Sequence, residues 1–158
     1  MDKVLELLYA NARSSVKDIA AQAGITETEV EETITRLEMD GVILGYNAVV
    51  DPEKTTDRGV TAFIEVKITP DSGGFDRLAR RISEYDQVRG CYLMSGGYDL
   101  AVIIEGKDLY EVASFVAEKL APLNGVLSTA THFQLRVYKH EHFVIKSGLQ
   151  RERLPVSP

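Results

Sequence analysis

Cysteine, histidine and long apolar runs are scarce in this sequence of 158 residues. The single cysteine, Cys91, excludes an internal disulfide, and its place in a strand-like run is typical of a small core residue. No apolar run approaches the roughly 20 residues that a membrane-spanning helix needs. The first residues hold no basic region followed by an apolar stretch, so we expect no signal peptide. These absences predict a cytoplasmic protein that does not bind a membrane.

Histidine occurs at only three positions, which limits the catalytic and metal sites that the chain can build. His140 and His142 would lie on one side of an extended strand, but a zinc site needs a third and a fourth ligand as well. Acidic residues are numerous, yet they are scattered over predicted helix surfaces where nothing would bury them. We therefore expect no catalytic constellation, no metal site and no cofactor.

Positive charge is scarce in the first 46 residues. They hold four basic side chains against nine acidic ones, a net charge of −5, whereas the other 112 residues hold 14 basic and 15 acidic side chains. The net charge of the whole chain, −6, therefore lies almost entirely in this first segment. Affinity for nucleic acid depends largely on Lys and Arg that neutralise phosphates. This segment therefore has few of the positive charges that nucleic-acid binding needs.

The same segment nevertheless has the pattern of a helix-turn-helix. Thr26 and Glu29 form a capping box that begins a helix, and apolar residues from Val30 to Leu37 recur at helical spacing. Gly24 marks a tight turn between this helix and an apolar helical stripe over residues 16–23, and one more short helix precedes them. In such a motif the second helix enters the major groove of DNA, so the pattern predicts a DNA-binding module.

The second half of the sequence alternates between strand and helix periodicity. Asp108 and Glu111 form another capping box, and Pro122 ends the helix that they begin. The predicted order is a strand over 60–68, a helix from Phe75, strands over 88–94 and 100–104, the helix from Asp108, and a strand over 127–138. This βαββαβ order predicts a ferredoxin-like sheet with both helices on one face, in a chain of α+β class. The other face needs cover, which dimerisation would provide.

Four segments follow from these patterns. We expect a winged-helix-like DNA-binding domain over residues 1–46, a linker strand over 47–59, a ferredoxin-like domain over 60–140 and a tail over 141–158. Strand is expected at residues 42–44 and 49–50, after Gly41 ends the preceding helix. The tail contains two prolines and no periodicity, which favours poor order.

The chain from about Val4 to Tyr138 resembles the Lrp/AsnC family of transcription regulators, the feast/famine proteins. The resemblance is carried by an ordered set of short motifs with two-domain spacing. These are Asn11-Ala12-Arg13, Asp18-Ile19-Ala20, Gly24-Ile25-Thr26, Arg36-Leu37-Glu38, Gly41-Val42-Ile43 with Gly45-Tyr46, and Gly96-Gly97-Tyr98-Asp99-Leu100. It implies an N-terminal domain that binds double-stranded DNA and a C-terminal domain that senses an amino acid or related metabolite. It further implies dimers that assemble into octamers.

One departure from the family concerns the helix that would read DNA. Its exposed face carries Glu27, Glu31, Glu32 and Glu38, where family members usually have basic or neutral polar residues. Glu can accept a hydrogen bond from cytosine, but several acids would be repelled by the phosphates of the groove. A charged helix face that simply contacts solvent is the alternative reading. The candidate DNA-contacting residues are Arg13, Lys17, Thr26, Thr28, Arg36, Lys54 and Arg58.

The turn at residues 95–99 is the candidate effector site. Its glycines would leave backbone N–H groups open to a carboxylate, and Asp99 could bind an α-ammonium group. The alternative is a plain hairpin turn in which Asp99 caps its own backbone. By the resemblance, threonines of the last strand of a neighbouring dimer complete the site. The candidate effector-binding residues are Gly96, Gly97, Tyr98, Asp99, Thr129 and Thr131.

The sequence therefore predicts a transcription regulator whose effector biases the spacing of its DNA-binding modules. A sensing or assembly subunit of the same fold that does not bind DNA is the rival. A third hypothesis is a porphyrin-type decarboxylase, because a few relatives of the fold have that activity. His132, near the sheet, would be its candidate catalytic residue.

Overall fold

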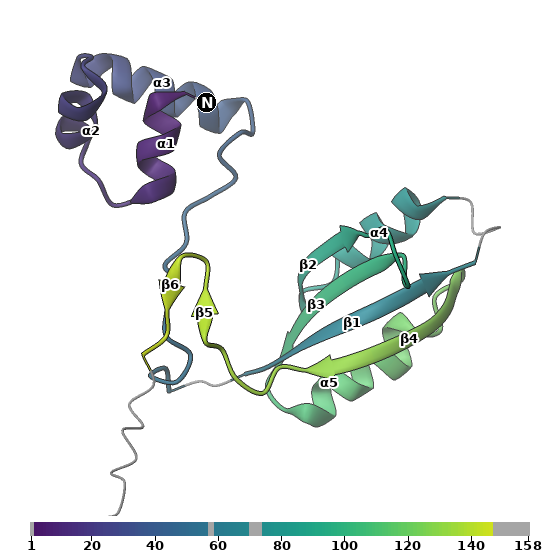
Figure 1. The fold of residues 1–158 in the computed structure, drawn as a ribbon. Helices are drawn as coiled ribbons and strands as arrows, with labels where there is room; N and C mark the ends of the chain where they lie inside the picture. The colour runs from purple at the N-terminus through teal and green to yellow at the C-terminus, as the bar shows by residue number, and fades with distance from the viewer. Residues whose placement is uncertain (1, 57–58, 70–73, 147–158) are drawn as a thin grey trace, which may run out of the picture. The chain divides into compact units, whose positions relative to one another are not determined.

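The computed structural model describes residues 2–56, 59–69 and 74–146 (Figure 1). Contacts divide the chain into two compact units, Met1–Ala48 and Val49–Pro158. Arg58 and residues 147–158 of the tail, both named in the predictions above, lie outside the described residues.

The N-terminal unit consists of three helices, α1 (Lys3–Ala10), α2 (Val16–Ala23) and α3 (Glu27–Met39). Each begins at a side chain that accepts a backbone N–H of its first turn, which satisfies donors that the helix leaves unpaired. Gly24 ends α2 with a φ of 73°, a left-handed conformation that glycine adopts without strain. One shared apolar core joins the helices. Its buried members are Val4, Leu8, Ile19, Ala20 and Val30.

The predicted helix-turn-helix is confirmed in detail. Thr26 accepts the backbone N–H of Glu29, and the Glu29 carboxylate accepts the backbone N–H of Thr26, so both halves of the capping box are present. Val30 and Leu37 are buried on the apolar face of α3. The sequence spacing therefore predicted the start of α3, the second helix of the helix-turn-helix, to within one residue.

The C-terminal unit is an antiparallel sheet with helices packed on one face (Figure 1). Its elements are β1 (Val60–Ile68), α4 (Phe75–Ser83), β2 (Val88–Leu93), β3 (Leu100–Gly106), α5 (Leu109–Phe115) and β4 (Val126–Phe133). Helix α5 continues into one wider, π-helical turn, η1 (Val116–Leu120). The strand order β2-β3-β1-β4 is that of the predicted βαββαβ fold, with β1 and β3 in the centre.

Alternation along β1 sets the two faces of this sheet. Ala62, Ile64 and Val66 are fully buried against the helices, together with Leu78 and Ile82 of α4. The residues between them, such as Phe63 and Glu65, point to the opposite surface, because neighbouring residues of a strand face opposite sides. We call this second surface the open face.

A short hairpin follows the sheet. Strands β5 (Lys139–His140) and β6 (Phe143–Val144) pair around a two-residue turn, Glu141 and His142. The hairpin crosses residue 140, where we expected the sheet domain to give way to the tail. It also corrects the expectation for two histidines, since His140 and His142 lie in a strand and a turn rather than along one extended strand.

Several predicted strands are absent, and one predicted strand end is wrong. Residues 42–44 and 49–50, and the described part of the linker over 47–56, form no strand. Strand β4 ends at Phe133 rather than Tyr138. The reason is the same in each case, because a strand needs a neighbour to pair with. The ladder between β1 and β4 ends at Ala62 and Phe133, with one more bond from Gln134 N–H to the Thr61 carbonyl.

Candidate functional sites

The exposed face of α3 is as acidic in the structure as in the sequence. Glu27, Glu31 and Glu32 are all exposed along it, and Thr35 lies beside them. Hydrogen bonding from the Thr26 backbone N–H, and then from its hydroxyl, lowers the pKa of Glu29 below its ordinary value of 4.5. Glu29 therefore adds one more negative charge to the first turn of α3 at neutral pH.

The candidate DNA-contacting side chains of the N-terminal unit divide into exposed and engaged groups. Arg13, Lys17 and Thr28 are exposed at the ends of the helices. Arg36 forms an ion pair with Asp2, at 3.3 Å between Nη2 and Oδ2, which ties the end of α3 to the start of α1. The Thr26 hydroxyl is engaged in the capping box, where it also donates to Glu29 at 2.8 Å.

Lys54 belongs to the other unit. Its ammonium lies 3.7 Å from the Asp51 carboxylate in the turn before β1. The structure thus groups Arg13, Lys17, Thr28 and Arg36 in one compact unit and does not group Lys54 with them.

The segment after α3 is held by a tyrosine. The Tyr46 hydroxyl donates to the Glu38 carboxylate at 2.9 Å, so one acid of the helix is partnered within the unit. Desolvation and this neighbouring carboxylate raise the pKa of Tyr46. The sequence motifs included both residues but gave no sign of their contact.

The candidate effector turn connects β2 to β3 at residues 94–99. The Met94 N–H donates to the Asp99 carbonyl at 2.8 Å, which closes the turn. Gly96 has a φ of 139°, a conformation that side chains rarely adopt. A Cβ added at Gly97 would have no atom within 4 Å, so the backbone there is open to approach.

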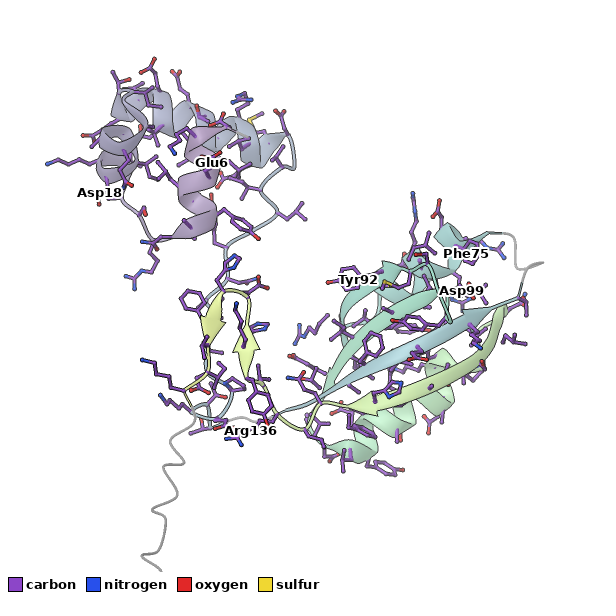
Figure 2. All side chains as sticks on the ribbon, viewed as in Figure 1. Glu6, Asp18, Phe75, Tyr92, Asp99 and Arg136 are labelled. Atoms are coloured by element: carbon purple, nitrogen blue, oxygen red, sulfur yellow. The ribbon has the colours of Figure 1, made fainter. Side chains whose placement is uncertain are left out.

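Asp99 fastens this turn to the neighbouring strand (labelled in Figure 2). Its carboxylate accepts the backbone N–H of Ile68 at 2.7 Å, and its own N–H donates to the Val66 carbonyl at 3.0 Å. The described hydrogen bond to the Asp99 carboxylate thus comes from β1 rather than from the backbone of the turn itself. A ligand ammonium at Asp99 would have to share that carboxylate with the strand.

The two threonines of the candidate site lie elsewhere in the sheet. Thr129 pairs with Val66 and Thr131 with Ile64, so both point to the helix side of β4, where they are half-buried. Strand β1 separates them from Asp99, a gap of about two strand spacings or roughly 10 Å. One chain alone does not bring the threonines to the turn.

The remaining candidate, Tyr98, contacts a residue of the open face. Its ring packs edge-on against Phe63, with 5.9 Å between centroids. Phe63 also lies 5.9 Å from the ring of His132, whose Nε2 is 3.3 Å from a Glu65 carboxylate oxygen. Sequence reasoning missed this chain of contacts from turn to sheet surface. The alternation of β1, with Phe63 and Glu65 between buried residues, was the available signal.

The described residues contain no group of three or more potential metal ligands, and no described helix is long and apolar enough to cross a membrane. His132, the candidate of the decarboxylase hypothesis, lies on the open face beside Glu65.

Both units match known domain families. Residues 2–38 match the AsnC-type helix-turn-helix domain, and residues 61–143 match the Lrp/AsnC ligand binding domain. The chain is 46% identical over 158 residues to YugG of Bacillus subtilis, an uncharacterized HTH-type transcriptional regulator, with 99% of this chain and 95% of that protein covered. It is 31% identical over 137 residues to the HTH-type transcriptional regulator Ptr1 of Methanocaldococcus jannaschii, covering 87% and 90%.

Solved structures share the fold. AsnC of E. coli superposes with a TM-score of 0.68 at 19% identity, covering 90% of this chain and 94% of that one. A transcriptional regulator of Neisseria meningitidis in complex with L-Met superposes with a TM-score of 0.70 at 24% identity, covering 87% and 89%.

Proposed function

Since the chain belongs to the Lrp/AsnC family of transcriptional regulators, we propose which of its residues contact DNA and which hold an amino-acid effector. The general function follows from the family: the protein is a DNA-binding transcriptional regulator with a C-terminal domain that senses an amino acid or related small metabolite. It acts in the cytoplasm and is not an enzyme in this proposal.

The N-terminal unit contacts operator DNA through α3 and its flanks. Thr28, near the first turn of α3, reaches base edges, and the exposed cations Arg13 and Lys17 contact phosphates. Arg36 can contact a phosphate only if its ion pair with Asp2 breaks or is shared with that phosphate. The Thr26 hydroxyl is bonded to Glu29, so Thr26 contributes by positioning the start of α3. Lys54 and Arg58 supply further phosphate contacts in this proposal.

The effector binds at the turn between β2 and β3. A carboxylate lies on the open backbone at Gly96 and Gly97, and the ammonium lies near Asp99. Thr129 and Thr131 come from a neighbouring dimer, because β1 separates them from the turn of their own chain. The single observation that supports the site is the open backbone at Gly97 close to Asp99, whose carboxylate is held by a hydrogen bond from Ile68 of β1.

Dimers form through the open face. It presents Phe63 and Tyr92 beside half-buried Ile103, an apolar surface on the side of the sheet opposite α4 and α5, the described helices of this unit (Tyr92 is labelled in Figure 2). Burial of such a surface between two sheets would supply the apolar area that a stable two-fold interface needs. Assembly of dimers into octamers would then bring threonines of one dimer to the turn of another.

A calorimetric screen of the standard amino acids tests the effector proposal. Gly97→Val should abolish binding of any hit without changing the melting temperature of the free protein, because a Cβ at Gly97 would have no atom within 4 Å. Gly45→Val, at a glycine that is equally open, is the matched control and should bind normally. The site assignment fails if no amino acid binds, or if a hit binds Gly97→Val as well as wild type.

A second function is favoured by one observation, the net charge of −5 in residues 1–46. A sensing or assembly subunit that does not bind DNA would keep the same fold. Titration of a mixed-sequence duplex over a salt series separates the two, because phosphate contacts give affinity that falls steeply with salt. Binding with a steep slope supports the regulator, and no binding at any salt concentration supports the subunit.

A further inference from the structure

The charge of the chain changes sign after the sheet. Residues 134–158 hold five basic side chains against two acidic ones, whereas residues 1–46 hold four against nine. Within the described part, Arg136, Lys139 and Lys146 stand against Glu141 alone. The C-terminal hairpin is therefore positive in a chain whose other segments are negative.

The hairpin is anchored at its base. The Arg136 guanidinium lies 3.3 Å from a Glu53 carboxylate oxygen and 5.5 Å from the ring centre of Tyr138 (Arg136 is labelled in Figure 2). Ile145 N–H donates to the Tyr138 carbonyl at 2.9 Å, which extends the pairing of β5 and β6 by one step. Arg136 is thus already engaged by Glu53 and Tyr138 at the base of the hairpin.

The projecting part keeps its cations and aromatics in solvent. Lys139 and Lys146 are exposed, and neither forms an ion pair with any residue that the structure describes. The side chains of Tyr138 and Phe143 are 70% and 59% exposed. A two-stranded ribbon has the width of a DNA major groove, and free lysines at its flanks suit the phosphates that border the groove.

We propose that this basic hairpin, residues 136–146, contacts the phosphate backbone of double-stranded DNA through Lys139 and Lys146. It supplies cations in which the helical unit is poor. The inference rests on the proposed function, since it requires that the protein binds DNA at all. An anionic membrane surface is a less suitable partner, because such surfaces are recognised by clusters of about 4–8 basic residues, whereas residues 136–146 hold three.

The test measures the salt dependence of binding to a mixed-sequence duplex by fluorescence anisotropy. Lys139→Gln with Lys146→Gln should reduce the slope of log affinity against log salt by about 2, or roughly 50-fold in affinity at about 0.1 M salt. The matched control is Arg80→Gln with Lys107→Gln, which removes the same charge from exposed positions on α4 and after β3. The control should retain the wild-type slope.

A second variant acts in the opposite direction. Glu141, in the turn, has a φ of 51°, a left-handed conformation that Asn tolerates better than Glu. Glu141→Asn should therefore preserve the hairpin, remove its only described acid and raise duplex affinity several-fold.

The outcomes separate this inference from the function on which it rests. Binding by wild type with equal slopes in the lysine variant and its control would overturn the hairpin contact alone. No duplex binding by wild type would overturn both. The inference would also be overturned if the protein bound phosphatidylserine vesicles more tightly than the duplex and lost that binding in the lysine variant. That result would assign the hairpin to a membrane surface.

Discussion

The carboxylate of Asp99 accepts a hydrogen bond from the backbone N–H of Ile68 at 2.7 Å, across the end of β1. This bond lies where the pairing of β1 with β4 shifts register, between Lys67 and Ile68. Asp99 therefore closes a strand end that would otherwise lack an acceptor. The same carboxylate is the proposed partner of the effector ammonium, so one side chain has both a structural role and a binding role.

Substitution of Asp99 separates these roles. Asp99→Asn retains an oxygen for the Ile68 N–H but removes the charge, whereas Asp99→Ala removes both. We expect both variants to bind the amino acid about tenfold or more weakly, and only Asp99→Ala to lose about 1–3 kcal/mol of unfolding free energy. Calorimetry and chemical denaturation measure the two effects. Normal ligand binding by Asp99→Asn would show that the charge has no role.

The open face offers a test of self-association. Phe63→Glu places a carboxylate on the surface proposed to pair two sheets, beside Glu65. We expect the dimer to dissociate at least about tenfold more readily, because a charge would be buried without a partner. Leu109→Glu, at an exposed apolar position at the start of α5, is the control. Sedimentation equilibrium that gives the same dimer for all three proteins would place the interface elsewhere.

The acidic face of α3 makes a prediction about DNA affinity. Glu31→Lys with Glu32→Arg changes the charge of that face by four, so binding to any duplex should strengthen and depend more steeply on salt. Glu84→Lys with Glu118→Lys makes the same change on exposed positions of the other unit. Equal gains in both variants would mean that only net charge matters and that α3 does not face DNA.

The capping box makes the N-terminal unit sensitive to acid. The pKa of Glu29 is lower in the folded unit than its ordinary value of 4.5, so ionised Glu29 stabilises the fold above that pH. This stabilisation is lost as pH falls through the folded pKa. The melting temperature of wild type should therefore fall more steeply than that of Glu29→Gln between about pH 5 and about pH 3. Parallel curves would show that the capping box contributes nothing through charge.

Local signals in the sequence were enough for most of the fold. The pairing of Thr26 with Glu29 fixed the start of α3, and the alternation from Ala62 to Ile68 fixed β1 and its buried face. Boundaries that depend on a partner strand were wrong. Val49 has strand propensity but pairs with no described strand, and beyond Phe133 the chain leaves β1, so that Tyr138 pairs within the short hairpin instead of extending β4. Strand propensity alone does not form a ladder.

The candidate sites likewise combine features that local sequence predicts with contacts between distant residues that it does not. The open turn at Gly97 was visible from the glycines. The bond from Ile68 to Asp99 and the pairing of Arg36 with Asp2 join residues 31 and 34 positions apart, so no local pattern indicates them. Contacts of this kind decide whether a candidate side chain is available to a ligand.

Selection of bound duplexes from a random-sequence library tests the central claim most directly. The account predicts enrichment of a pseudo-palindromic site, because two copies related by a two-fold axis would place α3 of each in equivalent grooves. It also predicts that an amino acid which binds the wild type changes the affinity for that site, and that Gly97→Val is insensitive to it. Failure to enrich any sequence, with no duplex binding at low salt, would contradict the claim that this chain regulates transcription by contacting DNA.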